Sequence, residues 1–86
     1  MEMSAKPDSF EEIDVRGVEA PAHILRILQK TSQLPPGTAL RARLDNNPFQ
    51  LYDLLQQRGF VLHAQKTPDG TYLATVSENR NVRAAH

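Results

Sequence analysis

Two short segments of this 86-residue chain combine the expected end of a strand, a proline and polar side chains. They cover residues 16–23 and 45–48. A guanidinium such as that of Arg16 donates charge-assisted hydrogen bonds to carboxylates and phosphates. A histidine such as His23 exchanges a proton near neutral pH, and free amides at a helix start attract anions. The sequence therefore predicts a ligand-binding or partner-binding site made of Arg16, Gly17, Glu19, Ala20, Pro21, His23, Asp45, Asn46 and Asn47.

The same residues also have a structural interpretation that needs no ligand. Pro21 and Asn47 would simply start helices, and Arg16 would form an ion pair with Glu19 or Asp45. We favour this plainer interpretation, because caps occur on most helices whatever the protein does.

The three histidines do not predict a metal site. His23, His63 and His86 could combine with Asp45, but their spacing matches no compact ligand motif, such as two histidines one helical turn apart. We expect His63 on the open face of the sheet and His86 in a C-terminal tail. His23 alone could act as an acid or base, but no second catalytic group is identifiable. We therefore expect no cofactor, no metal and no catalytic residue.

Two arginines are expected on the solvent face of a strand. Arg41 and Arg43 alternate with apolar residues, which is the pattern of a strand with one buried and one wet face. They could form a stripe that binds nucleic acid or protein. We favour cross-strand pairing with Glu12 and Asp14, which would face the same way. Few aromatic residues accompany them, which argues against base stacking.

Composition excludes several classes of function. The chain has no cysteine, so it has no disulfide, no thiolate nucleophile and no thiolate metal ligand. It carries 10 basic and 10 acidic side chains, and this zero net charge argues against non-specific binding to nucleic acid or acidic lipid. No apolar run approaches the ~20 residues of a membrane span, and the start has no signal-peptide core. We expect a cytoplasmic protein.

The first segment must be positioned by a strand and a helix. Residues 10–15 alternate as a half-buried strand, and Gly17 allows a sharp turn. Pro21 is predicted at the first helical position, where no amide hydrogen is needed. The helix is expected to reach about Gln33, with one apolar face made of Ile24, Leu25, Ile27 and Leu28.

The second segment repeats this arrangement. Residues 38–44 predict a strand, Asn47 an N-cap and Pro48 the first helical position. The second helix has a core stripe and stops at Arg58-Gly59. Residues 60–66 and 71–77 predict a hairpin around a Pro-Asp-Gly turn. The stripe consists of Leu51, Leu54 and Leu55.

The resulting order, β-α-β-α-β-β, predicts an α/β two-layer sandwich. A four-stranded mixed sheet carries two helices on one face and leaves the other face open. The domain is expected over residues 10–77, between a flexible tail at residues 1–9 and a disordered tail at residues 78–86. An exposed sheet edge is compatible with a monomer or a weak dimer.

The first segment resembles a known signature. Residues 14–21 read DVRGVEAP, which is similar to the "L/V-D-x-R-G-L-x-C-P" motif of the SirA/TusA-like sulfur-carrier proteins. Pro36-Gly37 and the second segment resemble that family's "P-G" turn and "D-D-P" helix start. The resemblance implies strand order 1-2-4-3, a fold also found in the C-terminal domain of a bacterial translation initiation factor.

The departures from that motif change the expected function. The family's carriers hold a persulfide on the cysteine before the proline, and that position is Ala20 here. A later motif proline is replaced by His23. Sulfur transfer through position 20 is therefore chemically excluded, and the resemblance points to the cysteine-lacking, functionally uncharacterised branch of this superfamily, made of small bacterial proteins or modules.

We therefore expect a non-enzymatic accessory or protein-interaction module. It would dock a protein partner, which the sequence does not identify, through the edge from Ala20 to His23. The alternative is a small anion or metabolite held at the paired helix starts. RNA binding, suggested only by the fold's occurrence in translation, is a third hypothesis that the neutral charge disfavours.

Overall fold

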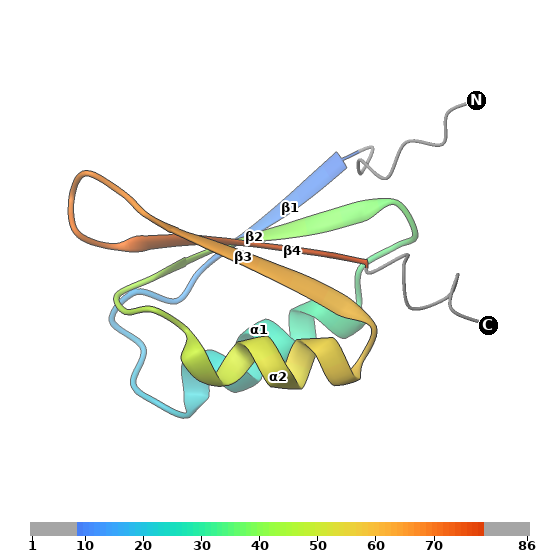
Figure 1. Ribbon diagram of the computed structural model, residues 1–86, viewed down its shortest axis with the longest axis horizontal. Coiled ribbons are helices and arrows are strands. Elements are labelled where there is room, and N and C mark those ends of the chain that lie inside the picture. The colour runs from blue at the N-terminus through green and yellow to red at the C-terminus, as the bar shows by residue number, and fades with distance from the viewer. Residues whose placement is uncertain (1–8, 79–86) are drawn as a thin grey trace.

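The computed structural model describes residues 9–78 as a four-stranded sheet with two helices (Figure 1). The sheet order is β1-β2-β4-β3. β1 pairs with β2 in parallel, and the other two pairs are antiparallel. The predicted two-layer α/β sandwich with order 1-2-4-3 is therefore confirmed. The elements are β1 Ser9–Asp14, α1 Ala22–Ser32, β2 Thr38–Leu44, α2 Phe49–Gln57, β3 Phe60–Lys66 and β4 Tyr72–Glu78.

β1 begins and ends one residue earlier than the sequence predicted, and β4 begins and ends one residue later. Ser9 belongs to β1, where it pairs with Thr38 and the two hydroxyl oxygens lie 3.1 Å apart. Glu78 ends β4 opposite Phe60. The rest of the two predicted tails, residues 1–8 and 79–86, lies outside the described residues, as does His86.

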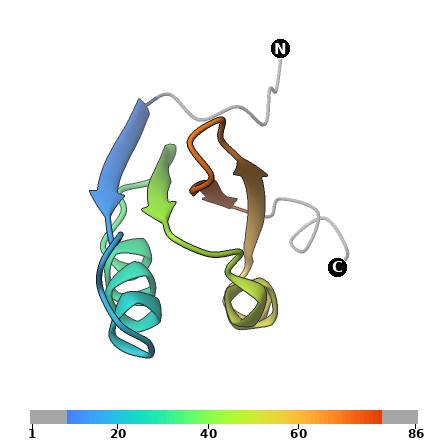
Figure 2. The same cartoon turned by 90° about the vertical axis from the view of Figure 1, so that its left-hand side faces the viewer.

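Both helices cover the same face of the sheet, and they run side by side in one direction (Figures 1 and 2). Alternation along the central strands places every second side chain toward the helices. In α2, Leu54 is only partly buried. In α1, Leu25 was predicted on the buried face but is 60% exposed, because the buried face of this helix contains Ile24 and Ile27 instead. The fully buried core includes Ile27, Leu40, Leu44, Leu51, Leu55 and Val76.

Both helices begin one residue later than predicted. Pro21 is the N-cap of α1, and its carbonyl accepts bonds from the amides of Ile24 and Leu25. Pro48 is likewise the N-cap of α2, so Asn47 does not cap this helix. Each proline has a ψ angle outside the helical range, 9° for Pro21 and 66° for Pro48, and this delays the first helical residue.

Two polar contacts hold outer parts of the fold in place, one between α1 and β1 and one in the β3–β4 turn. The Lys30 ammonium lies 2.9 Å from the Glu11 carboxylate, which ties α1 to the edge strand β1. In the β3–β4 turn the amide of Gly70 donates to the carbonyl of Thr67 at 3.0 Å, which confirms the predicted turn. No helix among residues 9–78 has the length and apolar character needed to cross a bilayer.

Candidate functional site

The two strand-to-helix junctions lie side by side, as expected. The amide of Gly17 donates to Oδ2 of Asp45 at 2.7 Å, which joins the turn after β1 to the turn after β2. The amide of Val15 continues the parallel pairing by donating to the carbonyl of Arg43 at 2.9 Å. Gly17 has φ 80°, a left-handed conformation that favours glycine, so the residue that makes this bond also makes the sharp turn after β1.

A shallow pocket of about 280 Å³ opens at this junction. Six of the nine residues predicted for the site line it, and two valines that sequence reasoning missed complete it. The alternation of Ile13 and Val15 pointed to the buried position of Val15, but nothing marked Val18 as a lining residue. The lining residues are Val15, Gly17, Val18, Glu19, Ala20, His23, Asp45 and Asn46.

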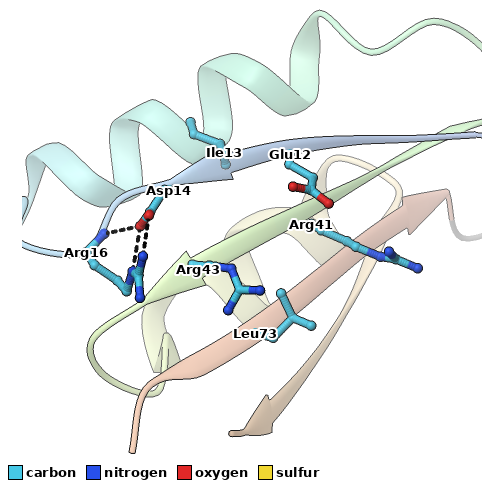
Figure 3. Close-up of a pocket in the computed structure, with 7 residues that line it drawn as sticks. All are labelled: Glu12, Ile13, Asp14, Arg16, Arg41, Arg43 and Leu73. Atoms are coloured by element: carbon cyan, nitrogen blue, oxygen red, sulfur yellow. Dashed lines mark hydrogen bonds and ion pairs between the residues drawn. The ribbon is translucent and has the colours of Figure 1, made fainter. Parts of the chain in front are cut away.

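The other three predicted residues do not line this pocket. Pro21 is exposed at the start of α1. Asn47 is partly buried, and its Oδ1 accepts no hydrogen bond within the described part of the chain. Arg16 lines a different pocket, on the open face of the sheet (Figure 3).

Arg16 forms an ion pair with Asp14, two residues earlier (Figure 3). Its Nε donates to Oδ1 at 2.9 Å and its second guanidinium nitrogen to Oδ2 at 2.7 Å. The amide of Arg16 also donates to Oδ1 at 3.0 Å. The predicted partners, Glu19 and Asp45, are therefore wrong. The tight turn after β1 brings the guanidinium back onto the carboxylate that ends the strand.

This ion pair predicts an unusually acidic Asp14. The Arg16 side-chain hydrogen bond is the main cause that lowers the pKa of Asp14 from 3.8 to about 2. Because the pKa is lower in the folded protein, the pair stabilises it above about pH 4, and this stabilisation is lost as the pH falls toward 2. Carbon-detected NMR titration should place the Asp14 midpoint near 2, and Arg16→Gln should move it back toward 3.8.

Asp69 supplies the control for that titration. Hydrogen bonds from Thr67 and Thr71 lower the pKa of Asp69, and Arg16 is the smallest of its causes. Arg16→Gln should therefore leave the Asp69 midpoint nearly unchanged. An Asp14 midpoint near 3.8 in the unmodified protein would contradict the ion pair.

The helix starts offer fewer free amides than the sequence suggested. In α1 the amide of His23 donates to the carbonyl of Glu19, and that of Ile24 to the carbonyl of Pro21. In α2 the amides of Phe49 and Leu51 donate to Asn47 and Pro48. Two of the first three amides of each helix thus already have acceptors, and this removes most of the expected anion-binding capacity.

The described histidines do not form a metal site. Among residues 9–78, no group of three or more His, Cys, Asp or Glu side chains is arranged to hold a metal ion. His63 is exposed on β3, as expected from its place on the open face. His23 is partly buried, and its Nδ1 forms no hydrogen bond within the described residues.

Large apolar side chains are exposed near the same end of the molecule. Leu25 lies in the first turn of α1 and is 60% exposed, and Phe49 is the first residue of α2 and is 75% exposed. Tyr52, three residues later, is 36% exposed. Both helices begin at the same end of the sandwich (Figures 1 and 2), so these side chains belong to the end that carries the pocket.

Comparison with known proteins agrees with this architecture. A family model described as "Uncharacterized conserved protein (DUF2249)" matches residues 12–77. A similar crystal structure is that of a SirA-like protein from Desulfitobacterium hafniense, with a TM-score of 0.69 and 17% identity over 77% of this chain and 93% of that chain. A search of the curated proteins finds no match. The structural likeness confirms the SirA-like fold that the sequence motif indicated.

Proposed function

The chain belongs to the conserved family DUF2249, and from this premise we propose that it is a non-enzymatic protein-interaction module on a sulfur-carrier-like scaffold. Its docking surface is the end of the sandwich where both helices begin. We name this surface the helix-start face and define it by Ala20, Pro21, Ala22, Leu25 and Phe49.

One observation carries this proposal: large apolar side chains are exposed at both helix starts. Leu25 and Phe49 are 60% and 75% exposed, although each lies next to core residues of its own helix. Large apolar side chains that stay exposed are typical of surfaces that bind a protein partner. Ala20, Pro21 and Ala22, which lead into α1, are also exposed, and Ala20 lines the pocket.

The chemistry at position 20 supports an accessory role. Ala20 is exposed and lines the pocket, at the position where the related motif has its cysteine. A methyl group cannot form a persulfide, and the chain has no cysteine elsewhere. The alternative, an anion at the helix starts, loses support because most of the amides it requires already have acceptors. RNA binding gains no support from a chain of zero net charge.

Site-specific crosslinking tests the docking surface. Ala20→Cys introduces the chain's single thiol, to which a photo-reactive group can be attached. We expect this protein to form a defined crosslinked complex in a lysate of the native host. The same group on Gln57→Cys, at the opposite end of α2, should not form it. Leu25→Ser combined with Phe49→Ser should reduce the yield by roughly tenfold or more, because buried apolar anchors dominate interface energy.

The controls separate docking from misfolding. Both serine substitutions replace exposed side chains, so the melting temperature should change little. Equal crosslinking from positions 20 and 57, or a yield that survives the double substitution, would show that the helix-start face is not the docking surface.

A further inference from the structure

A second pocket, of about 370 Å³, lies on the open face of the sheet, away from both helices (Figure 3). Its volume falls within the range of small-molecule sites. Three arginines and two carboxylates line it, so it has a local charge of +1 within a chain of zero net charge. We name it the sheet-face pocket, and the residues used below are Glu12, Asp14, Arg16, Arg41, Arg43 and Leu73.

Two of the three guanidiniums are held by neighbours. Arg16 is fixed by its two-pronged contact with Asp14, at 2.7 and 2.9 Å. Arg41 stacks over the ring of Phe10, with its guanidinium carbon 3.8 Å from the ring centroid. Such stacking fixes a cation without neutralising it. The register places Arg41 opposite Glu12 and Arg43 opposite Asp14, as predicted, but neither arginine forms an ion-pair contact with its opposite residue within residues 9–78. Beside the larger effect of the Arg16 hydrogen bonds, the Arg43 charge acts on Asp14 only through space, where it helps to lower the pKa of that carboxyl.

Arg43 is the exception. Its side chain is exposed and forms no hydrogen bond or ion pair within residues 9–78. The register puts it between Asp14 on β1 and Leu73 on β4. Because Asp14 is already bound by Arg16, the Arg43 guanidinium keeps its full hydrogen-bonding capacity beside an apolar side chain (Figure 3).

We propose that the sheet-face pocket binds a small organic anion, whose carboxylate or phosphate contacts Arg43 and whose apolar part packs on Leu73. Arg41 projects from the same face of β2 about 7 Å along the strand, and it adds positive charge on one side. Glu12, opposite Arg41 in the register, repels anions from the β1 side, which keeps the anionic group at the Arg43 end of the pocket. The helix starts take no part in this recognition.

NMR titration of the arginine side chains tests this site. The probes are phenyl phosphate, phenylacetate, inorganic phosphate and acetate at 150 mM NaCl, where surface attraction is screened beyond about 8 Å. We expect saturable shifts of the Arg43 Nε–Hε signal. The aromatic member of a pair should bind at least roughly fivefold more tightly than its parent ion, because its ring is buried on Leu73. If phenyl phosphate and inorganic phosphate bind more tightly than phenylacetate and acetate, phosphate is the preferred group; the opposite order identifies carboxylate.

Matched variants complete the test. Arg43→Gln should abolish saturation, whereas Arg26→Gln, which removes an exposed arginine on α1, should leave it unchanged. Leu73→Ala should remove the preference for the aromatic probes, while Leu54→Ala, which truncates a leucine of similar partial burial on α2, should keep it. Non-saturating shifts, or equal shifts at Arg26 and Arg43, would overturn the proposal. Because this readout is independent of crosslinking at position 20, it can fail while the protein-docking proposal stands.

Discussion

Leu51→Ala is expected to destabilise the domain by about 2–5 kcal/mol, which is the cost of an unfilled cavity in a packed core. Leu51 is fully buried in α2. A domain of this size has a net stability on the order of 3–5 kcal/mol. We therefore expect a large unfolded fraction at room temperature, measured as loss of the urea transition by circular dichroism.

Leu25→Ala is the matched control for that experiment. It removes the same atoms from the first turn of the other helix, where the leucine is 60% exposed. Surface substitutions of this kind change stability by less than about 0.5 kcal/mol. A similar urea midpoint for the two variants would show that Leu51 is not part of the core.

Gly17→Ala is expected to cost about 1–2 kcal/mol, the penalty for an L-residue in the left-handed region. Gly17 has φ 80°, and a Cβ there would meet no atom within 4 Å. The penalty is therefore conformational rather than steric. If the backbone relaxes to avoid it, the amide turns away from Asp45 and the 2.7 Å bond between the two junctions is lost.

Gly17→Asn separates the conformational penalty from the loss of the hydrogen bond to Asp45. Asparagine tolerates the left-handed conformation better than alanine does, so this variant should keep that bond. Its urea midpoint should lie between those of the glycine and alanine proteins. The Gly17 amide should exchange with solvent faster in the alanine variant than in the asparagine variant. Equal stability of all three proteins would contradict the left-handed turn.

Periodic features of the fold were predictable from the sequence. Leu40, Ala42 and Leu44 alternate with two arginines, and β2 has the predicted bounds. β3 also has its predicted bounds, since Gly59 and the Pro-Asp-Gly turn limit it on both sides. The strand order came from the resemblance, because periodicity identifies a buried face but not which strands are neighbours.

The errors concern interactions that periodicity does not encode. The partner of Arg16 depends on how the turn after β1 directs its side chain, and Asp14 was nearer than either predicted partner. The helix-start amides depend on local backbone bonds to Glu19 and Pro21. The sheet-face pocket requires the register that places Arg43 beside Leu73, which joins residues thirty positions apart in the chain.

The position of β1 at the sheet edge links both proposed sites to one fluctuation. β1 pairs only with β2, whereas β4 lies between two strands. Strands paired on one side open more readily than central ones, as hydrogen exchange detects in native proteins. Detachment of β1 would carry Asp14, Arg16 and Gly17 away together. The sheet-face pocket and the helix-start face would then lose their shape in a single cooperative opening, and a ligand that holds β1 in place would protect both.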